Sequence, residues 1–364
     1  MNPDEVWMKQ ALALAELGRG RTSPNPLVGA LVVRSGKIVG QGYHPYFSGP
    51  HAEAIALEKA GKRARGATLY VTLEPCSSWG KTPPCVEAVL AGAVKKVVVG
   101  SPDPNPKNHR AGILKLKKAG ITVRVGILAK AVEKQNQAFF KAMRTGRPFV
   151  TLKMAQSLDG KIATRTGESR WISSGPARQW VHELRSQADA VLVGKNTALV
   201  DNPRLQGING SSGKPWRIVL DPNSEVNSKA RVFEGPQLTL LVASEKKLQK
   251  ISSRPAIRRR VLLPVSEHGG RLDLKILLKK LVPLGVHHLL VEGGGELAWS
   301  FIRQGFADRL VWIMAPKIVG GRNAKTSVEG LGVKNPEKAI PLQWEKVYRL
   351  GPDWVFEAKC SQAS

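Results

Sequence analysis

The chain has 364 residues, which favours two domains over one, and its proportions of charged and apolar residues exclude wholesale disorder. The formal net charge of +28 would suit nucleic acid, a membrane surface or a phosphorylated substrate, but the basic residues are spread along the whole chain, as on a solvated surface. Three cysteines make no disulfide framework, and no apolar run has the length of a signal peptide or a membrane span. We therefore expect a cytoplasmic protein with no membrane partner.

The first half alternates helical and strand patterns. In chain order these patterns predict a helix over 4–17, strands over 27–33 and 37–43, a helix over 51–60, a strand over 67–73, a helix over 85–91, a strand over 96–100, a helix over 113–119, a strand over 121–126 and one long helix over 129–144. Such alternation is typical of an α/β sandwich with helices on both faces of the sheet.

Three residues of this half have the chemistry of zinc ligands, namely His51, Cys76 and Cys85. One imidazole and two thiolates suit a catalytic zinc, because three protein ligands leave one tetrahedral position open for water. Zinc lowers the pKa of water at that position to roughly 7. Glu53, two residues after His51, is the predicted proton shuttle. Cys85 lies in the first turn of its predicted helix, where the helix dipole favours the thiolate.

Two alternatives stand beside this interpretation. The cysteines could be small core residues, or a fourth ligand such as His44 or His109 could complete a structural zinc site, although neither has the spacing of a paired finger. The order of the residues favours catalysis, because His-x-Glu followed by Pro-Cys and a second Cys resembles the signature of zinc deaminases. The sequence departs from that signature in one respect, since eight residues separate Cys76 from Cys85 where the signature has two.

With these residues placed, the first half resembles the cytidine-deaminase-like domain of a bifunctional enzyme family of riboflavin biosynthesis. The matching segments are 24–29, 51–53, 72–76, 81–85 and 103–106. The resemblance implies that His51, Cys76 and Cys85 hold zinc, that Glu53 moves protons and that Asn25 orients a pyrimidine. The alternative for Asn25 is an Asx-turn between two prolines. The sequence departs from the family at Ser78-Trp79, where histidines are usual, and over 107–110, where glycines are usual.

The segment 145–148 marks the predicted domain boundary, which divides the chain into 1–146 and 147–364. Beyond it the patterns predict strands over 149–156, 190–194, 217–220, 238–242, 261–265 and 288–291, and helices over 175–186, 272–283 and from the glycines after Glu292 to about Arg303. A strand, a glycine turn and a helix start can bind the phosphates of a dinucleotide through backbone N–H groups. The glycines could also serve the turn alone, because the full dinucleotide fingerprint is missing.

This half contains the segments 153–161, 167–172, 184–185, 194–201, 202–205 and 291–295. With these segments it resembles the second domain of the same family, a dihydrofolate-reductase-like reductase that uses NADPH. The resemblance implies NADP contacts at Ala155, Trp171, Thr197, Asp201, Gly294, Gly295, Glu296, Leu297, Ala298, Trp299 and Ser300. It implies substrate contacts at Lys153, Ser169, Arg185, Arg204, Leu205 and Glu292. Arg185 would clamp a phosphate, since a guanidinium binds phosphate with two N–H groups; the alternative is a surface charge on an amphipathic helix. Ile208 stands where the family usually has an arginine, and Arg204 would cover part of that role.

Together the halves predict a zinc-dependent deaminase and NADPH-dependent reductase acting on a phosphorylated pyrimidine. The first site would replace the 2-amino group of 2,5-diamino-6-(5-phosphoribosylamino)pyrimidin-4-one with oxygen, and the second would reduce the ribose part of the product to a ribityl chain. We expect a homo-oligomer, a dimer or a tetramer. The alternatives are a deaminase of tRNA or single-stranded DNA, or a basic nucleic-acid-binding protein with structural zinc. Salt-dependent binding to nucleic acid would favour either alternative, and ammonia release from the free nucleotide would exclude the second.

Overall fold

The structure is a computed structural model that describes residues 2–80, 82–208, 215–247 and 260–360. The chain divides into two compact units, 1–147 and 148–364, so the division falls one residue beyond the boundary expected after Gly146. Within these described ranges, no helix combines the length and the apolar character needed to cross a membrane.

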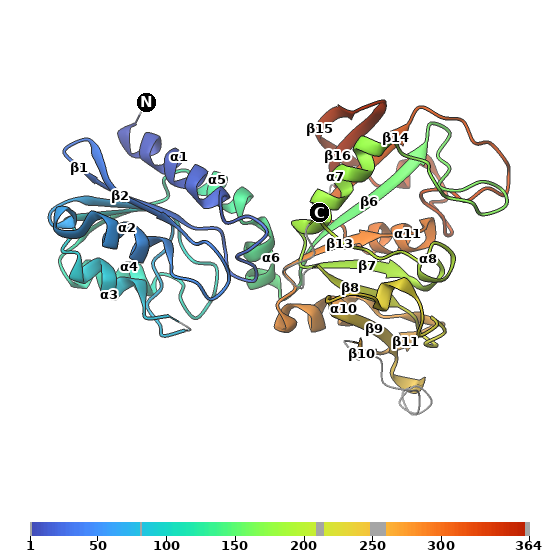
Figure 1. The fold of residues 1–364 in the computed structure, drawn as a ribbon, viewed down its shortest axis with the longest axis horizontal. Coiled ribbons are helices and arrows are strands. Elements are labelled where there is room, and N and C mark those ends of the chain that lie inside the picture. The colour runs from blue at the N-terminus through green and yellow to red at the C-terminus, as the bar shows by residue number, and fades with distance from the viewer. Residues whose placement is uncertain (1, 81, 209–214, 248–259, 361–364) are drawn as a thin grey trace. The chain divides into compact units, whose positions relative to one another are not determined.

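The first unit is built on a five-stranded sheet (Figure 1). Its strands, in sheet order, are β2 (Lys37–Tyr43), β1 (Gly29–Arg34), β3 (Thr68–Leu73), β4 (Lys96–Ser101) and β5 (Thr122–Val125). β1 runs antiparallel to β2 and β3, whereas β3, β4 and β5 are parallel. The helices are α1 (Pro3–Glu16), α2 (Ala52–Ala60), α3 (Cys85–Ala91), α4 (Ala111–Lys118), α5 (Ala129–Gln135) and α6 (Gln137–Thr145).

Helices cover both faces of this sheet, as the alternation of helices and strands predicts. Alternate residues of a strand point to opposite faces, so Ala30 and Val32 pack in the core formed with α2, α3 and α4. Leu31 and Val33 pack on the other face, in the core formed with α1. The α2 backbone lies so close to β2 that a Cβ on Gly42 would approach the Ala52 carbonyl oxygen to 2.5 Å. Glycine at this position therefore seats the start of α2, which carries two of the predicted site residues.

One predicted element is wrong, because the single long helix expected over 129–144 is two helices. The chain breaks at Asn136, which has φ −110° and ψ 24° and separates α5 from α6. Its side chain pairs with the backbone of Leu27, with Oδ1 2.7 Å from the Leu27 N–H and Nδ2 3.0 Å from the Leu27 carbonyl. These buried bonds to a segment more than a hundred residues away override the helical pattern of the alanine-rich sequence.

The second unit contains a nine-stranded sheet (Figure 1). In sheet order its strands are β10 (Arg260–Val265), β9 (Thr239–Ser244), β8 (Trp216–Leu220), β7 (Ala190–Gly194), β13 (His288–Glu292), β6 (Phe149–Ser157), β14 (Arg309–Ala315), β16 (Asp353–Cys360) and β15 (Leu342–Leu350). The strands from β10 to β14 are parallel, and β16 and β15 add an antiparallel hairpin at the edge. A small antiparallel pair joins β11 (Glu267–His268) to β12 (Arg271–Leu272).

The helices of this unit again lie on two faces. Among the described residues they are α7 (Gly175–Ser186), α8 (Lys195–Val200), α10 (Leu274–Leu281) and α11 (Gly295–Arg303). Side chains of α10 and α11 pack in one core, whereas side chains of α7 and α8 pack in others. The helix predicted from residue 272 begins two residues later, because the Asp273 side chain accepts the Ile276 N–H as an N-cap. The sequence patterns predict neither α8 nor β14 nor the β15–β16 hairpin.

Candidate active sites

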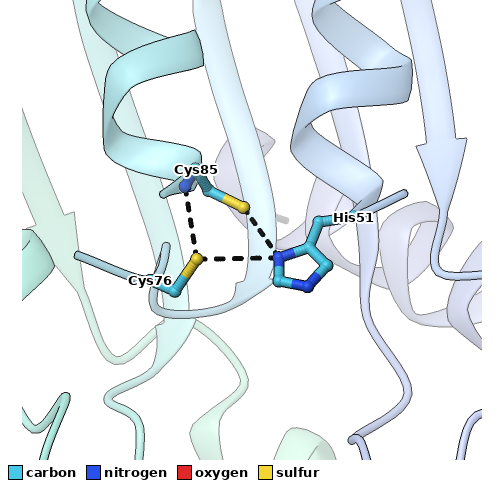
Figure 2. Close-up of side chains that lie close together, drawn as sticks. All are labelled: His51, Cys76 and Cys85. Carbon is cyan, nitrogen blue, oxygen red and sulfur yellow. Dashed lines mark hydrogen bonds between the residues drawn. The ribbon is translucent and has the colours of Figure 1, made fainter. Parts of the chain in front are cut away.

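The three predicted zinc ligands come together in the first unit, each from the end of a different element (Figure 2). His51 is the N-cap of α2, Cys76 follows β3, and Cys85 begins α3. The His51 Nδ1 atom lies 3.0 Å from Cys85 Sγ and 3.6 Å from Cys76 Sγ. The ligand atoms all lie within 4.8 Å of one another, and no further His, Cys, Asp or Glu of the described ranges joins them. One nitrogen and two sulfurs fit zinc, with one tetrahedral position left for water.

The two cysteines of the cluster differ in their pKa values. Hydrogen bonds from the Cys85 thiol, from His51 and from the Cys85 backbone N–H lower the pKa of Cys76 to about 4. The bond shared with Cys76, together with burial, raises the pKa of the Cys85 thiol. Within this pair the lower pKa is therefore that of Cys76, because the Cys85 N–H points at the sulfur of Cys76. A dication held here would bind both sulfurs as thiolates.

Glu53 lies in the first turn of α2 and is 3% exposed. Burial raises its pKa from 4.5 to about 7, partly offset by the positive charge of His51. A carboxyl group with a pKa near neutrality both accepts and donates protons readily, which suits general acid–base catalysis. His51, Glu53 and Cys76 line one cavity of about 280 Å³. The predicted shuttle therefore shares a cavity with two of the three ligands.

The structure also identifies a residue behind His51 that the sequence analysis missed. Because Nδ1 faces both sulfurs, the other ring nitrogen, Nε2, is left for Thr82, whose Oγ1 lies 3.3 Å away. A metal-ligating histidine usually donates its second ring N–H to such a partner, which fixes the tautomer and the ring orientation. Thr82 lies in the matching segment 81–85, but the sequence predicts no role for it, since it becomes a neighbour of His51 only in the fold.

We expect Thr82→Val to weaken zinc binding by about 10- to 100-fold, the usual cost of losing such an outer partner. The measurement is a competition titration of zinc against a chelator. Thr82→Ser keeps the hydroxyl and is expected to bind zinc like the unaltered chain. Equal affinities for Thr82→Val and Thr82→Ser would show that the hydroxyl does not support His51.

Asn25 also lines the cavity, whereas the two histidines considered as extra ligands do not bind at the cluster. The Asn25 Nδ2 atom lies 3.1 Å from His44 Nε2, and His44 Nδ1 lies 3.0 Å from the Pro50 carbonyl. His109 Nδ1 lies 2.8 Å from the carbonyl of Asp103. Neither histidine joins the cluster of His51, Cys76 and Cys85, so the described residues do not support a structural zinc site completed by one of them.

The two departures from the family pattern contact each other at the edge of this cavity. The Ser78 hydroxyl donates to Asn108 Oδ1 at 2.8 Å, and Asn108 Nδ2 donates to Asp103 at 3.1 Å. Glu74 binds the backbone of the loop that carries Asp103 and Asn108. It is 4% exposed, and its carboxylate accepts the backbone N–H groups of Asp103, Arg110, Gly112 and Ile113. The Glu74 carboxylate therefore binds the backbone at both ends of the loop that joins β4 to α4 and lines the cavity.

The second unit has a cavity of about 1560 Å³ that most of the predicted reductase residues line. The predicted residues lining it are Lys153, Ala155, Ser169, Trp171, Arg185, Thr197, Asp201, Arg204, Leu205, Glu292, Gly294, Gly295, Glu296, Leu297, Trp299 and Ser300. Ala298 is the exception, because it is fully buried in the core and its N–H bonds to the Gly294 carbonyl. The structure does not support the cofactor contact predicted for Ala298.

A buried triad of charges stands in this cavity. Lys153 and Glu292 are partners in the register of the parallel strands β6 and β13, and the Lys153 Nζ atom lies 3.7 Å from Glu292 Oε2. Arg185 of α7 binds the same carboxylate with two N–H groups, at 2.7 and 2.9 Å. This pairing excludes the alternative that Arg185 is a surface charge. Although burial alone would raise it, the charges of Arg185 and Lys153 hold the pKa of Glu292 at about 2, and burial lowers the pKa of Lys153.

This ion pair predicts a pH dependence of stability. The folded-state pKa of Glu292, about 2, lies below its ordinary value of 4.5, so its contribution is complete above pH 4.5 and is lost as the pH falls through 2. The difference between these two pKa values corresponds to about 3 kcal/mol in the free energy of unfolding. We expect the urea midpoint of the unaltered chain to fall more steeply with acid, between about pH 5 and 2, than that of Glu292→Gln. Parallel pH profiles for the two proteins would contradict this role of Glu292.

Three further features of the cavity suit a dinucleotide. The α11 helix begins at Gly295, and its N-cap, Gly294, brings no side chain that could cap the first-turn N–H groups. A phosphate can therefore approach these amides closely. Asp201 accepts a hydrogen bond from the Ser169 hydroxyl at 2.7 Å. Trp171 is 62% exposed, and the guanidinium of Arg178 stacks on its ring at 4.5 Å from the centroid. These residues fit a dinucleotide cofactor.

The position that departs from the family in this half is Ile208. Its side chain is 41% exposed, and its backbone N–H bonds to the Ser186 hydroxyl at 2.7 Å. Arg204, which was expected to cover part of the missing charge, pairs with Glu234 at 3.0 Å. Arg204 also lines the cavity, so its part in the role of the missing arginine stays a prediction.

Comparisons with known proteins agree with both halves. Residues 1–101 match the family model described as "Cytidine and deoxycytidylate deaminase zinc-binding region", and residues 148–356 match "RibD C-terminal domain". The riboflavin biosynthesis protein RibD of Aquifex aeolicus (strain VF5) is 44% identical over 354 residues, which is 97% of each chain. The RibD of Escherichia coli K12 is 38% identical over 96% of this chain and 97% of its own. The chain belongs to the RibD family.

Solved RibD structures resemble the whole chain. Acinetobacter baumannii RibD, form 1, has a TM-score of 0.88 at 35% identity and covers 99% of each chain. A deaminase/reductase from Thermotoga maritima has a TM-score of 0.85 at 35% identity over 98% of each chain. The expected fold is thereby confirmed, with a cytidine-deaminase-like first unit and a RibD reductase domain second. The chain is a riboflavin biosynthesis enzyme with a deaminase half and a reductase half, and the two nucleic-acid alternatives are not supported.

Proposed function

We propose that the chain catalyses two consecutive reactions. The first unit replaces the 2-amino group of 2,5-diamino-6-(5-phosphoribosylamino)pyrimidin-4-one with oxygen, and the second reduces the resulting 5-amino-6-(5-phosphoribosylamino)uracil to the ribitylamino product with NADPH. One observation carries this proposal. His51, Cys76 and Cys85 form a ligand cluster beside the buried Glu53, and the same chain holds a RibD C-terminal domain with its own cavity. The Thermotoga maritima relative is itself named as a diaminohydroxyphosphoribosylaminopyrimidine deaminase and 5-amino-6-(5-phosphoribosylamino)uracil reductase.

In the deamination, His51, Cys76 and Cys85 would hold a zinc ion, which would supply the Lewis acid that makes water a nucleophile at neutral pH. The protons are moved by Glu53, whose pKa of about 7 lets its carboxylate take one from water and give it to the departing ammonia. Asn25 holds the pyrimidine in the cavity. Burial of Glu53 keeps bulk water from competing for these protons.

In the reduction, the cavity of the second unit would hold NADPH, which would supply the hydride for conversion of the ribose part to a ribityl chain. The N-terminus of α11, with Gly294, Gly295 and their neighbours, holds the cofactor phosphates, since its first-turn amides are uncapped. Ala155, Trp171, Thr197 and Asp201 complete the cofactor site, and Lys153, Ser169, Arg185, Arg204, Leu205 and Glu292 contact the substrate. The carboxylate of Glu292 orients Arg185 and Lys153, so the outer edge of Arg185 can bind the substrate phosphate.

The test is to incubate the zinc-loaded chain with the diaminopyrimidine phosphate and to determine the product mass with and without NADPH. Without NADPH, we expect a product in which one amino group is replaced by oxygen, with one ammonia released. With NADPH, we expect two further hydrogens in the product and one NADPH consumed. Recovery of unchanged starting material in both reactions would refute the proposal.

Arg185→Ala is expected to raise the KM for the deaminated substrate by about 10- to 100-fold, as for the loss of a hydrogen bond to a charged group. Ammonia release from the diaminopyrimidine should remain unchanged, because Arg185 belongs to the other unit. Steady-state kinetics of NADPH oxidation measure the first quantity. The variant also leaves Glu292 with less compensating charge, so its unfolding transition must be compared with that of the unaltered chain. An unchanged KM would mean that Arg185 only positions Glu292.

We propose further that the chain forms a homo-oligomer in the cytoplasm. The β15–β16 hairpin carries large apolar side chains on an edge of the second sheet, with Trp344 60%, Val347 50%, Leu342 41% and Trp354 42% exposed. Apolar groups gathered at an exposed sheet edge favour association with another chain. Light scattering on the purified chain gives the number of copies, and a monomer would contradict this proposal.

A further inference from the structure

His44 is a buried group that neither the zinc cluster nor the proton shuttle uses. It follows β2 and is 2% exposed, and it lies on the wall of the deaminase cavity together with Asn25. Both of its ring nitrogens have partners, the Pro50 carbonyl at Nδ1 and the Asn25 side-chain amide at Nε2. These contacts connect the Pro50 carbonyl, through His44, to the side chain of Asn25, which lines the cavity.

The Pro50 carbonyl determines which ring nitrogen of His44 carries the proton. A carbonyl oxygen only accepts hydrogen bonds, so His44 Nδ1 carries the proton and donates it to Pro50 at 3.0 Å. Nε2 meets the side-chain nitrogen of Asn25 at 3.1 Å. An amide nitrogen only donates, so Nε2 is the acceptor of this bond. The Asn25 Oδ1 atom, which has no hydrogen-bond partner among the described residues, is left for a ligand.

We propose that His44 is a positioning residue that fixes the amide of Asn25 with Oδ1 available to the cavity. A ligand at this point must then bring an N–H donor, such as a ring N–H or an exocyclic amine, and a ligand with an acceptor there is disfavoured. The proposal rests on the proposed deamination. It explains why this position in the cavity selects a ligand that brings a hydrogen-bond donor. Asn136 supports the same arrangement, because it fixes the backbone of Leu27, two residues beyond Asn25.

A competing explanation is that His44 acts on the zinc cluster. Its ring meets His51 edge to face, with centroids 5.3 Å apart and an interplanar angle of 82°. Loss of His44 could then disturb a metal ligand rather than the amide of Asn25. The two explanations differ in whether the effect of His44 depends on Asn25, and in whether zinc is lost.

The test is a double-mutant cycle with His44→Phe and Asn25→Ala, assayed for ammonia release and for zinc per chain. His44→Phe keeps a ring of similar size but donates and accepts nothing. We expect it to lower kcat/KM of deamination about tenfold, the loss of roughly one hydrogen bond, with zinc and the reduction of supplied deaminated intermediate unchanged. In the Asn25→Ala background, His44→Phe should have no further effect. His44→Gln, whose amide also accepts and donates, should restore most of the activity.

Each outcome decides the proposal. Equal losses from His44→Phe with and without Asn25, or loss of zinc in both His44→Phe and His44→Gln, would assign His44 to the metal site instead. The tautomer is tested without turnover by the ¹⁵N shifts of the His44 ring in the zinc-loaded chain, where Nδ1 should be protonated and Nε2 not. A protonated Nε2 would overturn the proposal, whereas a correct tautomer in a chain that releases no ammonia would contradict the proposed deamination alone.

Discussion

Cys76→Ser should bind far less than one zinc per chain and should release no measurable ammonia from the diaminopyrimidine phosphate. Cys76 Sγ lies 3.6 Å from His51 Nδ1, and hydrogen bonds from Cys85 and His51 lower the pKa of Cys76 to about 4. A hydroxyl replaces it poorly, because zinc prefers the soft, deprotonated sulfur. The deamination then loses the Lewis acid on which its nucleophile depends.

The chain provides a matched control for this substitution. Cys360 is a half-buried cysteine in β16 of the second unit, outside the zinc cluster. Cys360→Ser should keep zinc and deamination at the level of the unaltered chain, as measured by metal analysis and an ammonia assay. If Cys76→Ser keeps both zinc and activity, the ligand assignment is wrong.

Glu53→Gln should lower deamination by about 10²- to 10⁴-fold, the usual contribution of general acid–base catalysis. Zinc should remain, because Glu53 is not one of the clustered ligands. A glutamine occupies the same buried volume in the first turn of α2 but neither accepts nor donates a proton in the reaction. Glu58→Gln, on the exposed side of the same helix, is the control and should leave ammonia release unchanged. Activity of Glu53→Gln near the unaltered rate would exclude Glu53 as the shuttle.

The deaminase ligands could be predicted because their spacing is local. His51, Cys76 and Cys85 each lie at the end of a short element, and a five-stranded sheet with close helices brings such ends together. The residues behind them could not be predicted. Thr82 and His44 contact their partners only through the fold, and the polarity of the His44 bonds depends on the carbonyl of Pro50.

The same distinction applies to the fold and to the reductase site. The register that opposes Lys153 and Glu292 across two parallel strands joins residues far apart in the sequence, so no local pattern shows the ion pair with Arg185. The break at Asn136 likewise depends on a distant backbone segment. The β15–β16 hairpin was missed because its first strand is mostly exposed on both faces and lacks a clear apolar alternation.

The most direct test of two independent sites on one chain is to supply the deaminated intermediate and NADPH to Glu53→Gln. The chain divides at residue 147 into units with separate cavities, and Glu53 belongs to the first. We predict that the folded, zinc-loaded variant oxidises NADPH at the rate of the unaltered chain and forms the ribityl product, although it releases almost no ammonia from the diaminopyrimidine. Loss of reduction in that variant would contradict the separation of the two chemistries.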